Sequence, residues 1–156
     1  MKGKPVSVLR AIILGGLTVG ALDLADAFIF FGLRGATLIR IPQGIAAGLI
    51  GRPAAISGGA ATAALGVGLH FTIATIIVAI FVLVSRALPV LAKRPFLFGP
   101  LYGVVAYVVM TFVVVRLSAI HASGFPATPP LINGLLIHMF GVGLPSALFA
   151  RAAARS

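Results

Sequence analysis

The sequence predicts an all-α polytopic membrane protein in which four transmembrane helices form a bundle, with an interfacial or re-entrant segment between the first and second helices. Composition indicates this class. The chain of 156 residues is 60% hydrophobic and 9% charged, whereas soluble domains carry about 25% charged residues. Its mean hydropathy is +1.19. The apolar residues also fall into four runs, each near the roughly 20 residues of helix that cross a bilayer. We therefore expect a single transmembrane domain over residues 1–156.

These runs place the four spans at about residues 11–31, 59–85, 96–115 and 131–150. The first span is bounded by Arg10 and Arg34, and the fourth ends at Arg151. The second span is rich in Ile and Val. A helix is still predicted there, because an isolated strand in lipid would leave its backbone groups unpaired.

The first run also has features of a cleavable signal peptide. Lys2 and Lys4 precede it, and the small-x-small triplet Ala25-Asp26-Ala27 lies within it. The run continues past this triplet to a full span, however, and a charge is unfavourable in the apolar part of a signal peptide. We therefore predict that the first helix is retained.

Basic residues at the ends of the spans predict the orientation of the chain. One side of the predicted bundle collects Lys2, Lys4, Arg10, Arg86, Lys93, Arg94, Arg151 and Arg155. The other side collects Arg34, Arg40, Arg52 and Arg116. The positive-inside rule then places both termini in the cytoplasm of a multi-pass protein, which we assign to the bacterial inner membrane. This topology accounts for the formal net charge of +10, so we expect no nucleic-acid partner.

Residues 32–58 are the least regular part of the chain. The stretch IPQGIAAGLIGRPAAISGG is too short and too interrupted to span a bilayer, yet too apolar for an aqueous loop. Two interpretations stay open. The segment is either a short amphipathic helix on the outer surface, which we favour, or a re-entrant element that lines a cavity.

The only two acidic residues of the chain, Asp23 and Asp26, both lie inside the first span. An ionisable group in hydrocarbon is costly unless it is paired, so each aspartate is a functional-site hypothesis. Helical spacing puts three small residues on the face of Asp23: Gly16, Gly20 and Ala27. Small residues let helices approach closely in lipid, so Asp23 is expected to face another helix.

Depth estimates bring two histidines to the level of these acids. With a rise of about 1.5 Å per residue, Asp23 and His138 lie about 18 Å from the cytoplasmic ends of their helices. Asp26 and His70 lie about 22 Å from theirs. The four side chains therefore form one predicted layer, which is the candidate proton- or ion-binding site.

Two arginines are the predicted ion-pair partners of the aspartates. Arg116 stands slightly above the layer, and Arg34 can reach down from the end of the first helix by snorkelling. Asp26 lies higher than Asp23 and nearer to Arg34. We therefore expect Asp26 to form an ion pair, and Asp23 to be the better candidate for a functional proton or ligand.

Several chemistries fit a buried layer of two Asp and two His. Such residues are typical of proton relays and coupling-ion sites in transporters, and histidine exchanges protons near neutral pH. The same donors suit a divalent metal such as zinc, and two facing histidines suit the axial positions of a haem. A purely structural alternative has the aspartates pair across helices and the histidines bond backbone carbonyls.

We therefore predict a small integral inner-membrane protein that acts as a proton- or cation-linked transporter or as a transport-associated protein. The alternatives are a structural or accessory subunit of a membrane complex, and a haem- or metal-binding four-helix membrane protein. No cofactor is expected unless the haem or divalent-metal alternative holds. The expected partners are the lipid bilayer, further copies of the chain and other membrane subunits.

Sequence motifs of enzymes are missing. The chain contains no Walker-type phosphate loop, no HExxH and no GxSxG, and it has no cysteine to serve as a thiolate nucleophile. With two carboxylates, a hydrolase would need both of them beside a water-accessible cavity. We therefore do not expect an enzyme.

Three strings carry a resemblance to a known group: GRPAAISGGAATAALGVGLHFTIA, KRPFLFGPLYGVVAYVVM and HMFGVGLPSAL. In these strings the chain resembles an uncharacterised family of small four-helix bacterial inner-membrane proteins. The resemblance implies the membrane class and the location, and it implies no activity, cofactor or site residue. The layout is also similar to that of small four-helix drug and cation exporters with one acidic residue in the first helix, without a shared motif.

Overall fold

The computed structural model describes residues 6–121 and 124–154, and the all-α prediction is confirmed over these residues. Four helical segments are long and apolar enough to cross a membrane: Val8–Gly32, Gly59–Ala87, Pro95–Leu117 and Thr128–Ala154. Each of them contains one of the spans predicted from the sequence. The chain is therefore a four-span integral membrane protein. Three residues used to predict its orientation, Lys2, Lys4 and Arg155, lie outside the described residues.

The first two spans are unbroken helices, α1 (Val8–Gly32) and α4 (Gly59–Ala87). The third and fourth spans each contain a π-helical segment. The third consists of α6 (Pro95–Val109), η1 (Met110–Val114) and α7 (Val115–Leu117). The fourth consists of α8 (Thr128–Ile137), η2 (His138–Gly143) and α9 (Leu144–Ala154). Three short helices lie in the connections: α2 (Arg40–Ile50), α3 (Arg52–Ser57) and α5 (Val90–Lys93).

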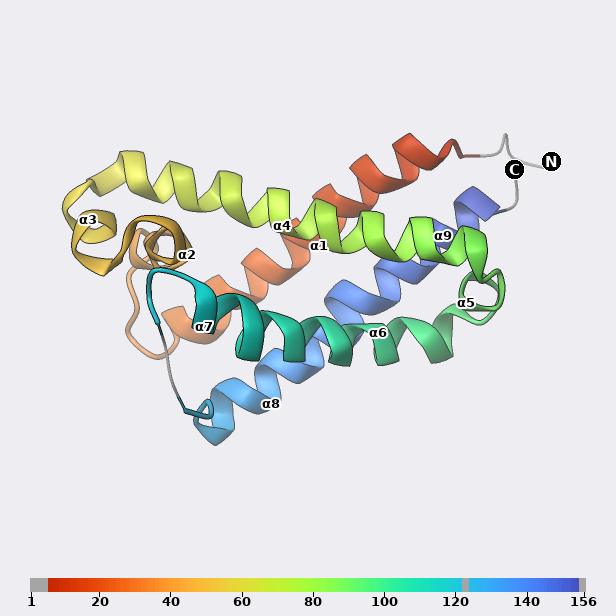
Figure 1. The fold of residues 1–156 in the computed structure, drawn as a ribbon. Helices are drawn as coiled ribbons and strands as arrows, with labels where there is room; N and C mark the ends of the chain where they lie inside the picture. The colour runs from red at the N-terminus through yellow and green to blue at the C-terminus, as the bar shows by residue number, and fades with distance from the viewer. Residues whose placement is uncertain (1–5, 122–123, 155–156) are drawn as a thin grey trace.

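The spans form an elongated bundle with two distinct ends (Figure 1). Helices α4 and α6 run along the length of the bundle, while α1 and the fourth span cross them diagonally. The start of α1, the end of α9 and helix α5 lie together at what we call the terminal end. Helices α2 and α3 lie at the opposite end, which we call the capped end.

The predicted small-residue face of α1 packs against α4. A Cβ atom placed on Gly16 would lie 2.8 Å from the Cα atom of Thr75, and one placed on Gly20 would collide with the ring of Phe71. These distances are shorter than van der Waals contact. The two helices can therefore pack this closely only because these positions lack side chains. The expectation that this face of α1 meets another helix is therefore confirmed.

Glycines also set the crossing between the third and fourth spans. A Cβ atom on Gly99 would lie 2.8 Å from the Cα atom of Leu144. One on Gly103 would meet the carbonyl of His138, and one on Gly143 would meet the backbone of Gly103. The two spans are thus in backbone contact, which is the close approach that small residues permit in lipid.

The main apolar core lies toward the terminal end. It is built around Val19 of α1, Val78 and Val82 of α4, and Val142 of η2, all of which are at most 2% exposed. The hydroxyl of Tyr102 donates to the carbonyl of Ile77 over 2.7 Å, which joins α6 to α4 at this level. The half of the bundle nearer the termini is therefore filled by apolar side chains and joined by a hydrogen bond between helices.

Helix α2 covers the other end of the bundle. In Figure 1 it is seen nearly along its axis while α4 and α6 run across the picture, so it lies across the bundle. Gln43 is 3% exposed, and its amide nitrogen donates to the carbonyl of Gly59 over 2.9 Å. A Cβ atom on Gly66 would meet the carbonyl of Pro42, so this glycine lets α2 rest directly on α4. The predicted short helix between the first two spans is thus present and closely attached.

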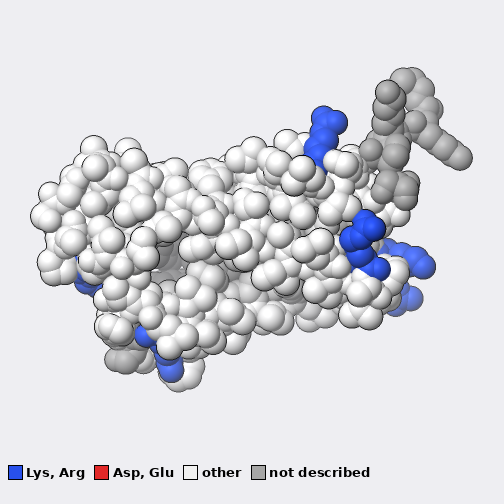
Figure 2. Space-filling view, turned by 45° about the horizontal axis from the view of Figure 1, so that its top comes forward, with Lys and Arg blue, Asp and Glu red and all other residues white. Residues whose placement is uncertain are grey.

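The outer surface shows the distribution expected of a membrane protein. On the face drawn in Figure 2, Lys and Arg lie toward the ends of the molecule and leave an uncharged region between them. The long helices also carry exposed aliphatic side chains, including Ile76, Ile80, Leu83, Leu101 and Val105. Apolar residues that would be costly in water are the favourable ones against lipid tails.

Candidate functional site

A cavity of about 840 Å³ lies beneath α2, between α1, α4, the π segments of the third and fourth spans, and α7. Figure 2 shows the molecule hollowed on one face, toward the capped end. Most of the lining is aliphatic, with Ile45 of α2, Ile73 of α4 and Val114 of η1 as examples. Its ionisable lining residues are Asp23, Arg40, Arg52, His70 and His138. Cavities of this size and polarity are typical of small-molecule sites.

The structure brings Asp23, His70 and His138 together at this cavity, as the depth estimates predict. One carboxylate oxygen of Asp23 lies 3.8 Å from Nε2 of His70, and the other lies 4.0 Å from Nδ1 of His138. The side chains are 25%, 12% and 16% exposed, in that order. Three different spans therefore supply one acid flanked by two imidazoles.

Each imidazole is held by a backbone carbonyl. Nε2 of His70 lies 2.9 Å from the carbonyl oxygen of Gly20, and Nδ1 of His138 lies 2.9 Å from that of Gly134. A carbonyl oxygen only accepts hydrogen bonds, so these two nitrogens carry the protons. The same nitrogens are the ones nearest to Asp23, and their protons are directed to the carbonyls.

The carboxylate of Asp23 is consequently left without a hydrogen-bond donor from the described residues. Both nearby nitrogens are beyond 3.5 Å from its oxygens. Its partial exposure comes from the cavity that it lines. A carboxylate in this position requires a proton, a cation or a polar ligand to compensate it.

Asp26 has a different environment. Its carboxylate accepts a hydrogen bond of 2.6 Å from the side-chain amide of Asn133 in α8, and it is not among the residues that line the large cavity. Asn133 is not among the residues of the predicted layer. A signal was present, because an Asn inside an apolar span is a residue type that hydrogen-bonds across helices.

The predicted ion pairs with Arg34 and Arg116 are wrong for the described residues, since the structure gives both guanidinium groups other partners. Arg34 donates to the carbonyl of Phe30 over 2.9 Å, and its guanidinium carbon lies 3.6 Å from the centre of the Phe30 ring. Arg116 donates to the carbonyl of Gly124 over 3.3 Å and lies 5.2 Å from the centre of the Phe112 ring. A carbonyl and an aromatic face close to each arginine satisfy it without a descent into the hydrocarbon.

Two cavity residues on the capping helices were also missed as site candidates. Arg40 begins α2 and Arg52 begins α3, and both line the cavity. In the sequence both arginines are interpreted only as orientation signals. Helix α2 therefore combines the two interpretations of residues 32–58, because it is a short helix across the end of the bundle that also lines a cavity.

The π segments border the same site. η1 begins at Met110 and η2 begins at His138, and both of these residues line the cavity. The ring of Tyr107, one turn before η1, packs edge-on against the ring of His138 with centres 5.3 Å apart. Widened π turns of this kind occur frequently at functional sites. Pro145 follows η2, and the wider turn relieves the clash that its ring would make with the carbonyl four residues earlier.

The cavity residues do not by themselves form a metal centre. Within residues 6–121 and 124–154, no group of three or more His, Cys, Asp or Glu side chains is arranged to hold a metal ion. The nitrogens of His70 and His138 that face Asp23 are bonded to carbonyls. The metal and haem alternatives of the sequence stay predictions.

The fold and the site define an integral membrane protein with an acid–histidine cluster at a cavity inside its helix bundle. Comparisons of the chain with models of protein families, with curated proteins and with solved structures find no match. The resemblance to small bacterial inner-membrane proteins stays a prediction.

Proposed function

We propose that the protein is a small proton-linked transporter of the bacterial inner membrane, with the large cavity as its substrate site and Asp23 as the carrier of the coupling proton. In this proposal both termini face the cytoplasm and the capped end faces outward. One observation carries it: the Asp23 carboxylate lines a cavity within the spans and receives no hydrogen bond from the described residues.

The contrast with Asp26 supports a functional role for Asp23. Asp26 is bonded to Asn133 in a neighbouring helix, which is how a polar residue stabilises a helix contact in lipid. Asp23 has no such partner among the residues described. A carboxylate inside a membrane span that accepts no hydrogen bond adds little to helix association, whereas a proton relay requires such a group.

His70 and His138 complete the proposed proton site. Their carbonyl bonds fix both rings beside Asp23, while the second nitrogen of each ring stays available for a further proton. Both rings lie within 4.0 Å of the carboxylate of Asp23. The other charged or titratable groups around this cluster are Asp26 on the same helix, Tyr107 against His138, and Arg40 and Arg52 on the cavity lining.

Proton flux in liposomes tests this proposal, and the two aspartates supply a matched pair of variants. Purified protein is reconstituted with a trapped pH-sensitive dye, and a pH gradient is imposed while potassium and valinomycin clamp the voltage. Wild-type protein and Asp26→Asn are expected to dissipate the gradient, whereas Asp23→Asn should lose the flux. Equal flux in wild type and Asp23→Asn would remove Asp23 from the mechanism.

The test requires that both variants fold. Asp23→Asn changes a side chain that has no hydrogen-bond donor to lose in the described structure, so its elution profile and helix content should match those of the wild type. Asp26→Asn keeps an oxygen that can accept the bond from Asn133. A flux that Asp26→Asn also loses would point to helix packing, not proton transfer, as the common cause.

A further inference from the structure

We infer that the cavity binds a single-chain amphiphile with an anionic head group, a phosphate or a carboxylate, whose head lies between Arg40 and Arg52 and whose chain lies in the aliphatic part. This inference names the substrate class of the proposed transporter and rests on that function. It starts from a second, smaller pocket of about 210 Å³ at the junction of α2 and α3. The small pocket and the large cavity share lining residues: Arg40, Gly44, Arg52 and Ile120. Together they form one region with a basic end and an apolar end.

The basic end is complementary to an anion. Arg40 and Arg52 have no hydrogen bond or ion pair from their guanidinium groups to any described residue, in contrast to Arg34 and Arg116. The only two acidic side chains of the chain do not pair with these arginines. Asp26 accepts a hydrogen bond from Asn133, and Asp23 lies deeper in the span. Arginine binds phosphate and carboxylate through two parallel hydrogen bonds, so two unpaired guanidinium groups on one pocket favour such a head group.

A buried amide in the same pocket also lacks a partner. Gln43 lines the small pocket, and its amide nitrogen donates hydrogen bonds to the carbonyl of Gly59 and to the hydroxyl of Thr62. The oxygen of this amide is buried, and no described residue donates to it. A buried acceptor of this kind is normally hydrogen-bonded.

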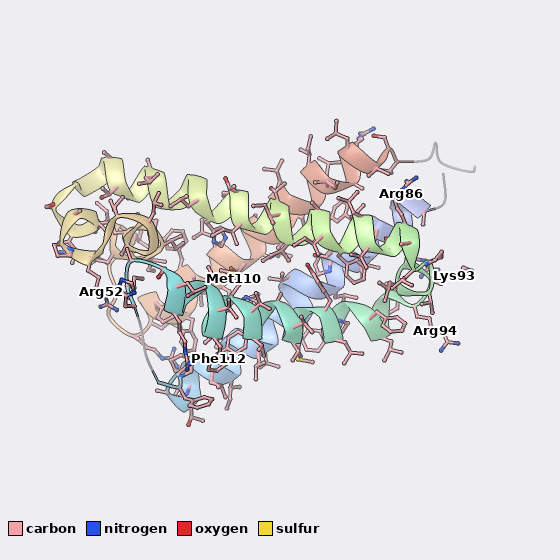
Figure 3. The ribbon with its side chains drawn as sticks, viewed as in Figure 1. Arg52, Arg86, Lys93, Arg94, Met110 and Phe112 are labelled. Atoms are coloured by element: carbon pink, nitrogen blue, oxygen red, sulfur yellow. The ribbon has the colours of Figure 1, made fainter. Side chains whose placement is uncertain are left out.

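The apolar end suits a single alkyl chain. Its walls include Ile41 and Ile45 of α2 and Leu69 and Ile73 of α4. The lining of the cavity extends along α1 from Phe31 to Val19, which corresponds to about 18 Å of helix. Gly44 faces this region with nothing within 4 Å of the position of its missing Cβ. In Figure 3, Arg52 marks the basic end of the region, and Met110 lies farther along the bundle on its apolar wall.

Native mass spectrometry in a neutral detergent tests the inference. The probes are decyl phosphate, decyltrimethylammonium with the same chain, and inorganic phosphate. The wild-type protein should retain decyl phosphate and neither of the other two. Equal retention of decyltrimethylammonium would overturn the anionic head group, and equal retention of inorganic phosphate would overturn the need for a chain.

Two double variants with equal charge separate a specific site from general attraction. Arg40→Gln with Arg52→Gln should weaken decyl phosphate binding by about tenfold or more, because hydrogen bonds to charged groups are strong. Arg34→Gln with Arg116→Gln removes the same charge from the same end of the bundle and should leave the affinity unchanged. Equal weakening by both pairs would overturn the site.

A space-filling variant tests the apolar end independently. Gly44→Met places a side chain in the cavity and should abolish binding. Gly68→Met is its control, since nothing lies within 4 Å of its missing Cβ either, and Gly68 is not a cavity residue. Both variants replace a helical glycine by a better helix former, so both should fold. Binding that survives Gly44→Met would place the probe elsewhere and overturn the inference.

Two further measurements distinguish the source of the ligand and the two proposals. Lysophosphatidate in lipid nanodiscs tests whether the ligand comes from the membrane, and decyl phosphate added to the protein in detergent tests whether it comes from solution. Retention of only one of the two ligands identifies the source. Retention of neither overturns the inference. Asp23→Asn should still bind decyl phosphate although it loses proton flux. If Asp23→Asn loses flux but no probe binds to the protein, the transporter proposal is supported and the substrate class is overturned. If the probe binds but Asp23→Asn has unchanged flux, the binding site is supported and the role of Asp23 in transport is overturned.

Discussion

At the terminal end of the bundle, glycines bring helix backbones into contact and Tyr102 ties α6 to α4. At the capped end α1, α4 and the π segments of the third and fourth spans surround a cavity of about 840 Å³, and α2 closes the end through Gln43 and Gly66. The difference follows from which residues face each other. Lipid tails are as apolar as leucine, so helices stay together where small residues allow close packing, and aliphatic side chains keep them apart elsewhere.

The two ends of the bundle contain different kinds of residues. The terminal end contains the filled core around Val78 and Val82, which resists change because close-packed interiors tolerate little change in volume. The capped end contains Asp23, which accepts no hydrogen bond from the described residues, the unpaired arginines of α2 and α3, and the only partnerless buried amide oxygen among the described residues. The packed core lies in the first region, and the groups proposed to act in transport and binding lie in the second.

The largest expected effect comes from breaking the glycine crossing that holds the spans together. Gly103→Leu would drive a side chain into the backbone of His138, which cannot move aside without separating the spans. Overpacking a core typically costs about 1–3 kcal/mol, and a backbone obstacle puts this variant at or above the upper limit. Gly68→Leu is the control, with open space at its Cβ position. Thermal unfolding in detergent measures both, and equal stability of the two would contradict the packing assigned to the crossing.

A smaller and more local effect is expected when α2 is displaced from α4. Gly66→Val would push against the carbonyl of Pro42, so the capping helix should lift while the spans keep their contacts. Because the chain has no cysteine, a single Ile45→Cys placed over the cavity reports this movement through its rate of thiol labelling. We expect faster labelling in Gly66→Val with a nearly unchanged unfolding temperature. A large fall in that temperature would show that α2 is part of the stabilising core.

The smallest effect concerns the Asp26–Asn133 hydrogen bond, which the comparison treats as structural. Polar contacts between membrane helices contribute about 0.6 kcal/mol on average and at most about 1.7 kcal/mol. A double-mutant cycle with Asp26→Ala and Asn133→Ala should give a coupling free energy in this range, measured by reversible unfolding in mixed micelles. Proton flux should persist in Asn133→Ala. A variant that unfolds normally and loses flux would assign this pair to the transport site.

Helical geometry explains which parts of the site could be predicted. The rise per residue and the spacing of small residues place Asp23 on the packed face of α1 at the depth of His138, and the structure finds them 4.0 Å apart. Depth alone predicts that Asp26 lies with His70. Asp26 instead contacts Asn133, because its side chain, three residues after Asp23, points toward a different neighbouring helix.

The remaining features depend on information that a periodic pattern lacks. Local packing determines which partners a long side chain such as Arg34 or Arg116 contacts. Each of these two arginines contacts a backbone carbonyl and an aromatic ring. The π segments and the closure of the cavity by α2 result from contacts between elements far apart in the chain. The sequence predicts that residues 32–58 hold a short helix, but not which space that helix covers.

The carbonyl of His138 rests in the notch left by Gly103, while the ring of the same residue lines the cavity beside Asp23. One residue is therefore part of both the tight crossing and the site. A pivot of the fourth span on α6 about this notch would turn the imidazole relative to the carboxylate of Asp23. A ligand that spread the helices would then reach the proposed proton site as a change of angle, with the crossing as its fulcrum.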